Sequence, residues 1–369
     1  LATGNGRCNY TNTSIDIKNY HGKATDFISH ALKYFSNNDV IRFFRKLGVL
    51  ERAEENGKIF PYSGHASAVL DALRFELERL SIKSICGFEV KSVTLCVGGF
   101  NISSADGRNL RTKAVIVATG GKASPSLGSN GSGFDILQSL GHTVTCLSPA
   151  LVQLRCDSGD VRPLQGLKLL ATAWACHNSK KLLSDNGEVL FTSYGLSGPP
   201  IFQLSSLVAM GKCNRISLDA MPEIDANELM SMLYSRRREL SHLSAENFFS
   251  GLCPRRIGNL ICRRSGIEKL SIRVKDIDNL TLKNMVYNIK DLSFRISGLN
   301  GWENAQVTAG GVSTSEFSPY SMESKLFPGL FAAGEVLDIF GDCGGYNLQW
   351  AWSSGRLAGE SAALFVRRH

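Results

Sequence analysis

The sequence predicts an α/β protein: a sheet domain that binds a ligand at the ends of its strands, an inserted β-barrel-like domain, and a helical subdomain inserted in turn into the barrel. Two observations support this. Two apolar runs, 114–118 and 330–333, are each followed by a glycine turn and a helical pattern, which is typical of strands buried in a helix-covered sheet. Between them, short extended segments with Gly, Pro and Asn-Gly turns alternate with a charge-rich helical pattern.

The composition indicates a soluble globular protein with more than one core. The chain has 369 residues, of which 43% are hydrophobic and 20% charged, and chains longer than about 250–300 residues usually divide into domains. No apolar run is long enough to span a membrane, and no secretory signal is visible. The ten cysteines form no Cys-x-x-Cys pair and no zinc-site spacing, so we expect a reduced, cytoplasmic protein without a metal site.

The first part of the chain predicts helices and a strand pair. Apolar positions at helical spacing in 24–47 indicate two short helices, with Ser36 or Asn37 as the cap of the second. Elements expected further on are a helix at 66–80 and hairpin-like strands at 84–91 and 94–102.

The run Ala114–Ala118 is continuous and apolar, as expected of a strand covered on both faces. Thr119, Gly120 and Gly121 follow, and their small side chains allow the backbone to approach a cofactor. Further glycines lead into a helix at 134–140. This order of strand, glycine turn and helix places the turn at the carboxyl end of a sheet, where open α/β sheets bind ligands.

The middle of the chain predicts the two insertions. Short extended segments indicate a barrel-like domain at 146–222, with a hairpin turn at Asp185–Gly187. Charge-rich helical patterns follow at 223–291, with Asp225 or Asn227 as a cap, and strand-like character returns at 292–312. The sheet domain therefore comprises 1–145 and 313–369.

The most informative stretch lies near the carboxyl end. A buried strand at 330–333 is followed by Gly334 and Glu335, by a glycine-dense turn, and by a helix from about Tyr346. The free N–H groups and the positive dipole at this helix start would stabilise a negative oxygen. Every fourth residue of the helix is small, so we expect a bare face close to a sheet or a flat ligand. These small residues are Ala351, Gly355, Gly359 and Ala363.

Five motifs resemble, in order, those of a bacterial FAD-dependent oxidoreductase family of the glutathione-reductase-like flavoprotein class. The family includes bile-acid-inducible flavin reductases of the BaiN/RdsA type and some aminoacetone oxidases. The resemblance implies a Rossmann-type FAD-binding domain. The motifs are Gly-Asn-Gly-Arg-Cys-Asn at 4–9, Ala-Thr-Gly-Gly at 118–121, 191–200, Thr-Ala-Gly-Gly-Val at 308–312, and the segment 333–351.

The resemblance also implies the cofactor contacts. Glu335 is expected to bind the ribityl hydroxyls, because two carboxylate oxygens suit vicinal hydroxyls. Backbone N–H groups of the turn and helix start are expected at the flavin pyrimidine edge. The implied contacts are Gly4, Gly6, Arg7, Asn9, Ala118, Thr119, Gly120, Gly121, Gly334, Glu335, Gly344, Gly345, Tyr346, Asn347 and Leu348.

One motif of the family pattern does not occur. Relatives have a βαβ unit with Gly-x-Gly-x-x-Gly before the segment that corresponds to 4–9. No such motif occurs in this sequence, so we expect the chain to lack this unit of the FAD domain.

The reaction implied by the resemblance is reduction of an enone, such as a bile acid or steroid-like substrate. NAD(P)H would visit transiently and pass a hydride to flavin N5 and then to the substrate. Many relatives carry a histidine where Ser193 stands, so Tyr194 and Tyr346 are the candidates for donating a proton or polarising the carbonyl.

Two other functions remain open. One is an amine oxidase that uses oxygen, and the other is a cofactor-free fragment that binds partners through its helical insertion. For the arginine clusters 236–238, 255–256 and 263–264, which have no interleaved aromatic residues, a solvated helix face is favoured over a nucleic-acid contact. A small-molecule substrate is therefore the expected partner.

Overall fold

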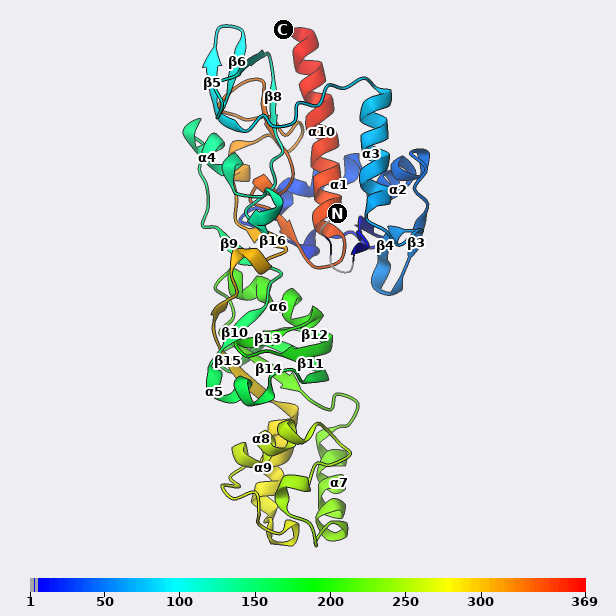
Figure 1. The fold of residues 1–369 in the computed structure, drawn as a ribbon, viewed down its shortest axis with the longest axis vertical. Coiled ribbons are helices and arrows are strands. Elements are labelled where there is room, and N and C mark those ends of the chain that lie inside the picture. Colours follow the sequence, from blue (N-terminus) through cyan, green and yellow to red (C-terminus); the bar gives the residue numbers. More distant parts are fainter. Residues whose placement is uncertain (1–2, 4–5) are drawn as a thin grey trace. The chain divides into compact units, whose positions relative to one another are not determined.

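The computed structural model describes residue 3 and residues 6–369. The chain divides into unit 1, residues 1–149 and 305–369, and unit 2, residues 150–304 (Figure 1). The predicted α/β character and the small barrel are confirmed. Within the described residues, no helix is both long and apolar enough to cross a membrane.

Unit 1 contains the two predicted apolar strands side by side. β8 (Val115–Val117) and β17 (Leu330–Ala332) pair in parallel, with Leu330 opposite Val115. The three residues of β17 are fully buried, whereas Ile116 on β8 is 40% exposed. The carboxyl ends of these strands lead directly into the 118–121 turn and into Gly334 and Glu335.

Three further sheets contain most of the other strands of unit 1. The predicted pair at 84–91 and 94–102 is shifted, because the turn lies at Val97 and Gly98, where Gly98 has φ +82°. The alternation of residue types continues across this turn and does not mark its place. The sheets are β1 (Thr11–Asn12) with β4 (Lys58–Pro61) and β3 (Glu51–Ala53), β2 (Tyr20–His21) with β18 (Phe340–Gly341), and β5 (Val90–Cys96) with β6 (Gly99–Ser104) and β7 (Asn109–Thr112).

The predicted helices of unit 1 are confirmed. Ser36 caps the second, and its side chain and that of Asp39 form a reciprocal capping box. The helices are α1 (Ser29–Tyr34), α2 (Asn37–Lys46), α3 (Ser67–Arg79), α4 (Ser132–Ser139) and α10 (Tyr346–Arg368).

Helix α10, the long red helix of Figure 1, begins at the predicted residue but presents a different face to the core. Trp350, Leu357 and Ala358 are buried, while Gly355 and Gly359 are exposed, and a Cβ added at either glycine would have no neighbouring atom within 4 Å. The expectation that the bare face lies against a sheet is wrong in this structure. Large apolar side chains bury more surface than glycines, so they determine which face packs inward.

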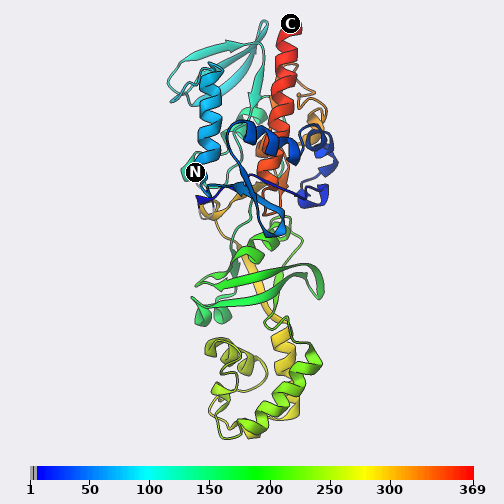
Figure 2. The ribbon, with the colours of Figure 1, turned by 90° about the vertical axis from the view of Figure 1, so that its right-hand side faces the viewer.

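Unit 2 is built on a closed barrel whose strands follow the order β10-β13-β12-β11-β14-β15; the long β11–β12 hairpin is the twisted green pair in Figure 2. The predicted turn at Asp185–Gly187 is wrong, because β12 runs through it and the chain turns at Asn178, with φ 53°. Gly187 instead makes room for Pro200. The strands are β10 (Leu154–Cys156), β11 (Lys168–His177), β12 (Lys180–Phe191), β13 (Gly195–Ser197), β14 (Arg215–Asp219) and β15 (Leu292–Leu299).

The helices of unit 2 include those predicted in the insertion, and the Asp225 side chain caps the first of them. They are α5 (Ser158–Val161), α6 (Pro199–Ala209), α7 (Ala226–Glu239), α8 (Arg255–Arg264) and α9 (Asn279–Lys290). The remaining strands are β9 (Ser148–Ala150) and β16 (Val307–Ala309), which lie where the chain passes from one unit to the other. The domain boundaries drawn from the sequence stay predictions.

The arginine clusters of the insertion have partners within unit 2. The Arg236 guanidinium donates to the carbonyl oxygens of Phe248 and Ser250. Others donate in the same way: Arg237 to Ile277, Arg256 to Pro163 and Gln165, and Arg264 to Ser293. These arginines hold loops in place, which a simple solvated helix face would not require.

Candidate functional site

The start of α10 is a tight glycine turn closed against β1. Gly345 caps the helix with φ +92°, and a Cβ there would lie 2.5 Å from the Thr11 carbonyl oxygen. Only glycine fits this position without strain. The first N–H groups of the helix, from Tyr346 to Leu348, have no partner within the helix, so this end favours a negative oxygen.

The turn before α10 is held by two asparagines. Asn347 Oδ1 accepts the N–H of Gly341 at 2.7 Å, and its Nδ2 donates to the Gly341 carbonyl at 2.9 Å. Asn12 Nδ2 donates to the Gly344 carbonyl at 3.0 Å. The Asn347 side chain is therefore occupied by the turn, and only its backbone N–H is available to a cofactor. A turn held in this way presents its donors without reorganisation.

The peptide of Gly334 is fixed by α10. Trp350 Nε1 donates to the Gly334 carbonyl at 3.0 Å, and Ser354 Oγ accepts the Gly334 N–H at 2.9 Å. Gly334 has φ +75°, which favours glycine. These contacts connect the end of β17 to the helix and determine where the following residue, Glu335, lies.

Glu335 joins three distant segments. Its Oε1 accepts the Thr308 N–H at 2.9 Å, and a Cβ at Gly121 would lie 2.2 Å from the same oxygen. Thr308 Oγ1 in turn accepts the Lys122 N–H at 2.7 Å. Burial raises the pKa of the Glu335 carboxyl above 4.5, although the hydrogen bonds from Thr308 lower it. The residue as a whole is only partly buried.

The turn after β8 also has its predicted form. Ala118 and Thr119 are exposed, and Gly120 has φ +72°. Thr119 packs so closely on α4 that a Cβ at Gly133 would lie 2.0 Å from its Oγ1. Ala118 and Thr119 are therefore accessible, whereas Gly121 is buried, and the path of the turn is fixed from the helix side.

Of the amino-terminal candidates, Asn9 lies beside the α10 turn, and Gly4 falls outside the described residues. A Cβ at Gly345 would lie 2.9 Å from Asn9 Oδ1, which also accepts the Ile59 N–H. Gly6 has φ +70°. The Arg7 guanidinium pairs with Glu54 and lies 4.2 Å from the centre of the Phe60 ring. The cofactor contacts predicted for these residues stay predictions.

The two candidate catalytic tyrosines belong to different units. Tyr346 is the first residue of α10, and burial together with the nearby Asp342 and Asp16 raises its pKa, so its hydroxyl keeps its proton. Its ring contacts that of Tyr20 edge to face. Tyr194 lies in unit 2, where its carbonyl accepts the Cys156 N–H. The site assembled in unit 1 therefore includes Tyr346 alone.

The sequence did not identify one pair beside the α10 turn. His21 Nε2 lies 2.7 Å from Asp342 Oδ1, and Asn19 Nδ2 donates to Asp342 Oδ2 at 3.2 Å. His21 and Asp342 are separated by 321 positions, so no local pattern could have indicated their contact.

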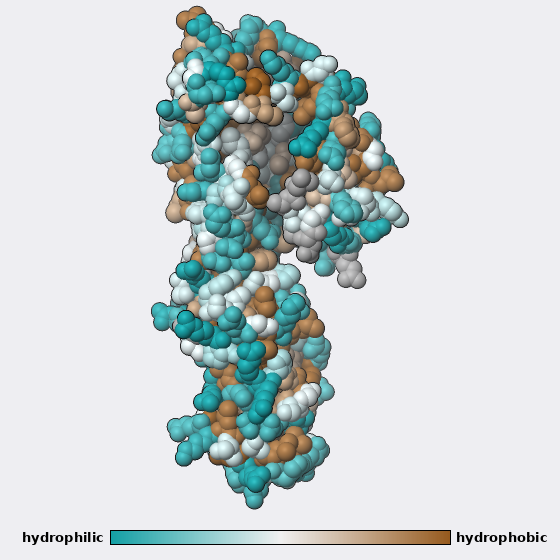
Figure 3. All heavy atoms as spheres, in the orientation of Figure 1, coloured by the Kyte–Doolittle hydropathy of each residue, from teal (hydrophilic) through white to brown (hydrophobic). Residues whose placement is uncertain are grey.

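These residues fit FAD. The site offers a carboxylate at Glu335 for ribityl hydroxyls, glycine turns at 120–121 and 344–345 where side chains would collide or strain the backbone, and a helix start that favours a negative oxygen. Figure 3 shows a recess in the visible face of unit 1.

Several known proteins are similar in sequence to this chain over almost its whole length. The pattern of the HI0933-like protein Rossmann domain family matches residues 1–361. The 3-dehydro-bile acid delta(4,6)-reductase of Clostridium scindens is 37% identical over 367 residues, which cover 98% of this chain and 89% of that protein. Ribosomal RNA dihydrouridine synthases of Escherichia coli and Haemophilus influenzae are 30% and 29% identical over 359 residues, covering 96% of this chain and 86% of theirs.

Proposed function

This chain belongs to the HI0933-like Rossmann-domain family of flavin-dependent oxidoreductases, and we propose that it reduces a carbon–carbon double bond conjugated to a carbonyl group. We propose NAD(P)H as electron donor and a small steroid-like enone as substrate. The single observation that carries the proposal is the convergence of Glu335, the 120–121 turn and the α10 start in one unit.

The names of the relatives describe a common chemistry. A delta(4,6)-reductase and a dihydrouridine synthase both add two hydrogens across a double bond. In uridine, as in an enone, that bond is conjugated to a carbonyl. Hydride addition at the β-carbon then gives an enolate, whose negative oxygen requires a donor.

Each group of this chain has a part in that reaction. When bound and reduced by the electron donor, the flavin would supply the hydride for the β-carbon of the substrate. Glu335 would hold ribityl hydroxyls, and the N–H groups at the start of α10 would stabilise negative charge at the pyrimidine edge. The Tyr346 hydroxyl, which burial keeps protonated by raising its pKa, is suited to donate a hydrogen bond to a carbonyl oxygen.

A small molecule is favoured over RNA as the substrate. RNA binding relies on arginines and lysines that are available to phosphates. In the helical insertion, Arg236, Arg256 and Arg264 already donate to carbonyl oxygens of their own unit. The visible face of unit 2 in Figure 3 mixes hydrophilic and hydrophobic residues without a continuous track.

The test separates the two half-reactions under anaerobic conditions. The purified chain is loaded with FAD, mixed with NADPH and followed by the loss of flavin absorbance, and then mixed with a 3-oxo-Δ4 steroid. We expect rapid bleaching and then recovery of the yellow colour with formation of the saturated ketone.

Other outcomes favour other functions. Bleaching by aminoacetone and not by NADPH contradicts the reductase and supports an amine oxidase. Dihydrouridine in ribosomal RNA, detected by mass spectrometry when the steroid is inert, supports the RNA substrate. A colourless chain whose melting temperature FAD does not change supports a cofactor-free role.

A further inference from the structure

We propose that His21, oriented by Asp342, donates the proton that completes the reduction at the α-carbon of the substrate. This inference rests on the proposed function and adds a catalytic residue to it. The two residues meet because β2 pairs with β18 in antiparallel register, which places His21 opposite Phe340, two positions before Asp342. Asp342 begins the turn that leads to the start of α10.

Two hydrogen bonds with Asn19 hold Asp342 in place. Its N–H donates to the Asn19 carbonyl at 2.8 Å, and its Oδ2 accepts from Asn19 Nδ2 at 3.2 Å. Its Oδ1 therefore faces His21 Nε2 in a fixed position, at 2.7 Å. The His21 ring also packs against Phe340, with ring centres 5.1 Å apart. A carboxylate that accepts one imidazole N–H fixes the orientation of the ring and stabilises its positive charge.

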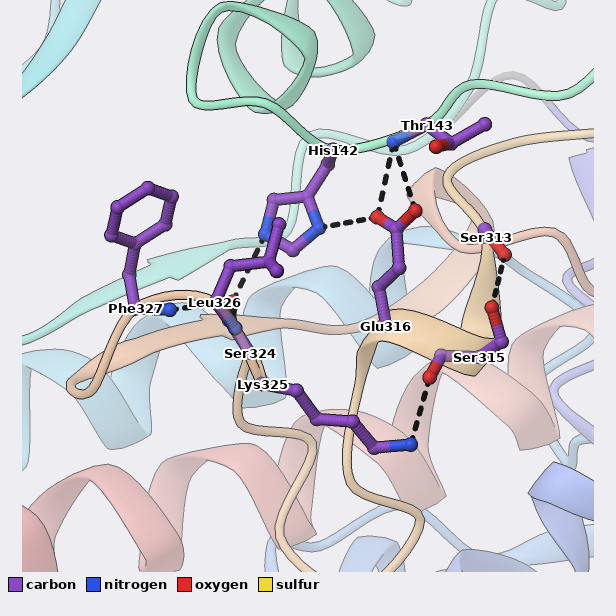
Figure 4. A network of polar contacts seen from close by, with 9 residues as sticks. All are labelled: His142, Thr143, Ser313, Ser315, Glu316, Ser324, Lys325, Leu326 and Phe327. Atoms are coloured by element: carbon purple, nitrogen blue, oxygen red, sulfur yellow. Dashed lines mark hydrogen bonds and ion pairs between the residues drawn. The ribbon is translucent and has the colours of Figure 1, made fainter.

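A second histidine–carboxylate pair in unit 1 shows what a purely structural pair looks like. His142 Nδ1 bonds Glu316 at 2.7 Å, its Nε2 lies 3.0 Å from Ser324 Oγ, and its side chain is 0% exposed (Figure 4). Both ring nitrogens are used, and solvent cannot reach them. The side chain of His21 is 19% exposed, and its bond to Asp342 uses only Nε2. His21 therefore has an accessible edge through which a proton can pass.

The proposed step transfers one proton from His21 to the α-carbon of the substrate. When a hydride forms the new C–H bond at the β-carbon, the double-bond electrons move to the carbonyl oxygen. The enolate then takes a proton at its α-carbon from Nδ1 of the His21 imidazolium; that N–H bond breaks, and its electron pair stays on the ring. The neutral imidazole regains a proton from water. The reduced cofactor is oxidised and the enone is reduced by two electrons.

Several titratable groups surround His21. Asp342 contacts it directly from the α10 turn, and Asp16 lies near enough to Tyr346 to act on its charge. Lys23 follows His21 in sequence and acts on Asp338. Tyr20 and Tyr346 are neutral, since burial raises the pKa of each.

The test compares His21→Gln and Asp342→Asn with His65→Gln, a matched change at an exposed histidine of the same unit. NADPH should bleach the flavin at the same rate in all three variants. The recovery step with the enone should be about 100-fold slower or more in His21→Gln.

A measurement without cofactor checks the pair itself. With 15N-labelled histidine, the Nε2 resonance of His21 should show a strong hydrogen bond that disappears in Asp342→Asn. Near-ultraviolet circular dichroism shows whether each variant is folded. The proposal is overturned if recovery in folded His21→Gln slows less than about threefold, a change too small for a lost general acid. It is also overturned if the resonance is insensitive to Asp342. Failure of bleaching in the unaltered chain contradicts the proposed function instead.

Discussion

At the scale of single residues, the hydrogen-bond partners of Glu335 and His142 indicate different roles for these two side chains. His142 is bonded through both ring nitrogens, to Glu316 and Ser324, and Ser324 Oγ also accepts the N–H groups of Leu326 and Phe327. A fully bonded buried group of this kind holds segments together. Glu335 instead accepts hydrogen bonds from Thr308 alone among the residues that the structure describes, which is suited to a ligand-binding carboxylate.

We predict that Glu335→Gln stabilises the cofactor-free chain and weakens FAD binding. A carboxyl whose pKa is raised in the folded state destabilises that state above 4.5, the ordinary value, because the unfolded carboxyl ionises freely in water. Glutamine removes this effect and can still accept the Thr308 N–H. The melting temperature of Glu335→Gln should therefore be higher than that of the unaltered chain at pH 7 and equal to it at pH 4. The affinity of this variant for FAD should be about 10-fold lower or more.

Glu316→Gln is the matched control for this prediction. Burial alone would raise the pKa of Glu316, but hydrogen bonds from Thr143 and His142 outweigh it and lower the pKa. Such a group stabilises the fold above 4.5, and the stability is lost as pH falls. This variant should therefore melt lower than the unaltered chain at pH 7. If the melting temperature at pH 7 falls in both Glu335→Gln and Glu316→Gln, or in neither, the opposite pKa shifts assigned to these two carboxyls are contradicted.

We predict that His142→Ala lowers the free energy of unfolding by about 1–3 kcal/mol, because it takes one hydrogen-bond partner from the partly buried Glu316 and one from the buried Ser324. Denaturant unfolding measures the change. His65→Ala, at an exposed position, should stay within about 0.5 kcal/mol. A loss below about 1 kcal/mol for His142→Ala would show that the network of Figure 4 contributes little.

Helix α10 is the element on which the site depends. Its start supplies the turn and the free N–H groups, and its first turns bind Gly334 through Trp350 and Ser354. Its middle packs by Leu357 and Ala358, while Gly355 and Gly359 face outward. Glycines within the same element therefore have opposite roles: at the start they are required by geometry, and in the middle they meet open space.

We predict opposite effects for two alanine substitutions in this element. Gly345→Ala should destabilise the chain by at least about 2 kcal/mol and weaken FAD binding, since it forces a left-handed φ and a contact with the Thr11 carbonyl. Gly355→Ala should stabilise by about 0.5–1 kcal/mol, as expected in an exposed helix interior. Denaturant unfolding and FAD titration measure both. A destabilising Gly355→Ala would show that this face is covered in solution.

At the scale of the whole molecule, the two units have separate cores. One core cluster lies entirely within unit 2 and includes Leu154, Phe191, Leu233 and Phe294. The other two clusters lie within unit 1. Unit 2 is also a single continuous segment with a closed barrel, which leaves no unpaired sheet edge. It has the features of a domain that folds alone.

We predict that residues 150–304 fold on their own. The isolated segment should show cooperative thermal unfolding by circular dichroism, and FAD should not shift its melting temperature. In the full chain, calorimetry should show that FAD raises one transition and leaves the other in place. A segment without cooperative unfolding would show that unit 2 needs unit 1.

Features that depend on neighbouring residues could be predicted from the order of amino acids. The sequence predicted a cap at Ser36 or Asn37, a cap at Asp225 or Asn227, a strand at 330–333 and a helix start at about Tyr346. The structure has caps at Ser36 and Asp225, the strand Leu330–Ala332 and a helix start at Tyr346. Spacing, capping side chains and glycine turns act within a few positions, so they can be read directly along the chain. The expected FAD-binding residues and the expected reaction came from the resemblance to the family motifs.

Features that depend on distant residues were set by the folded chain. In the folded chain Trp350 is buried, whereas Gly355 is exposed. Gly187 lies against Pro200. Arginines of the insertion, such as Arg236, donate hydrogen bonds to backbone carbonyls. Folding also brought His21 to Asp342, 321 positions away. Such contacts depend on the path of the whole chain, because burial and hydrogen bonding are satisfied in space and carry no periodic signal along the sequence.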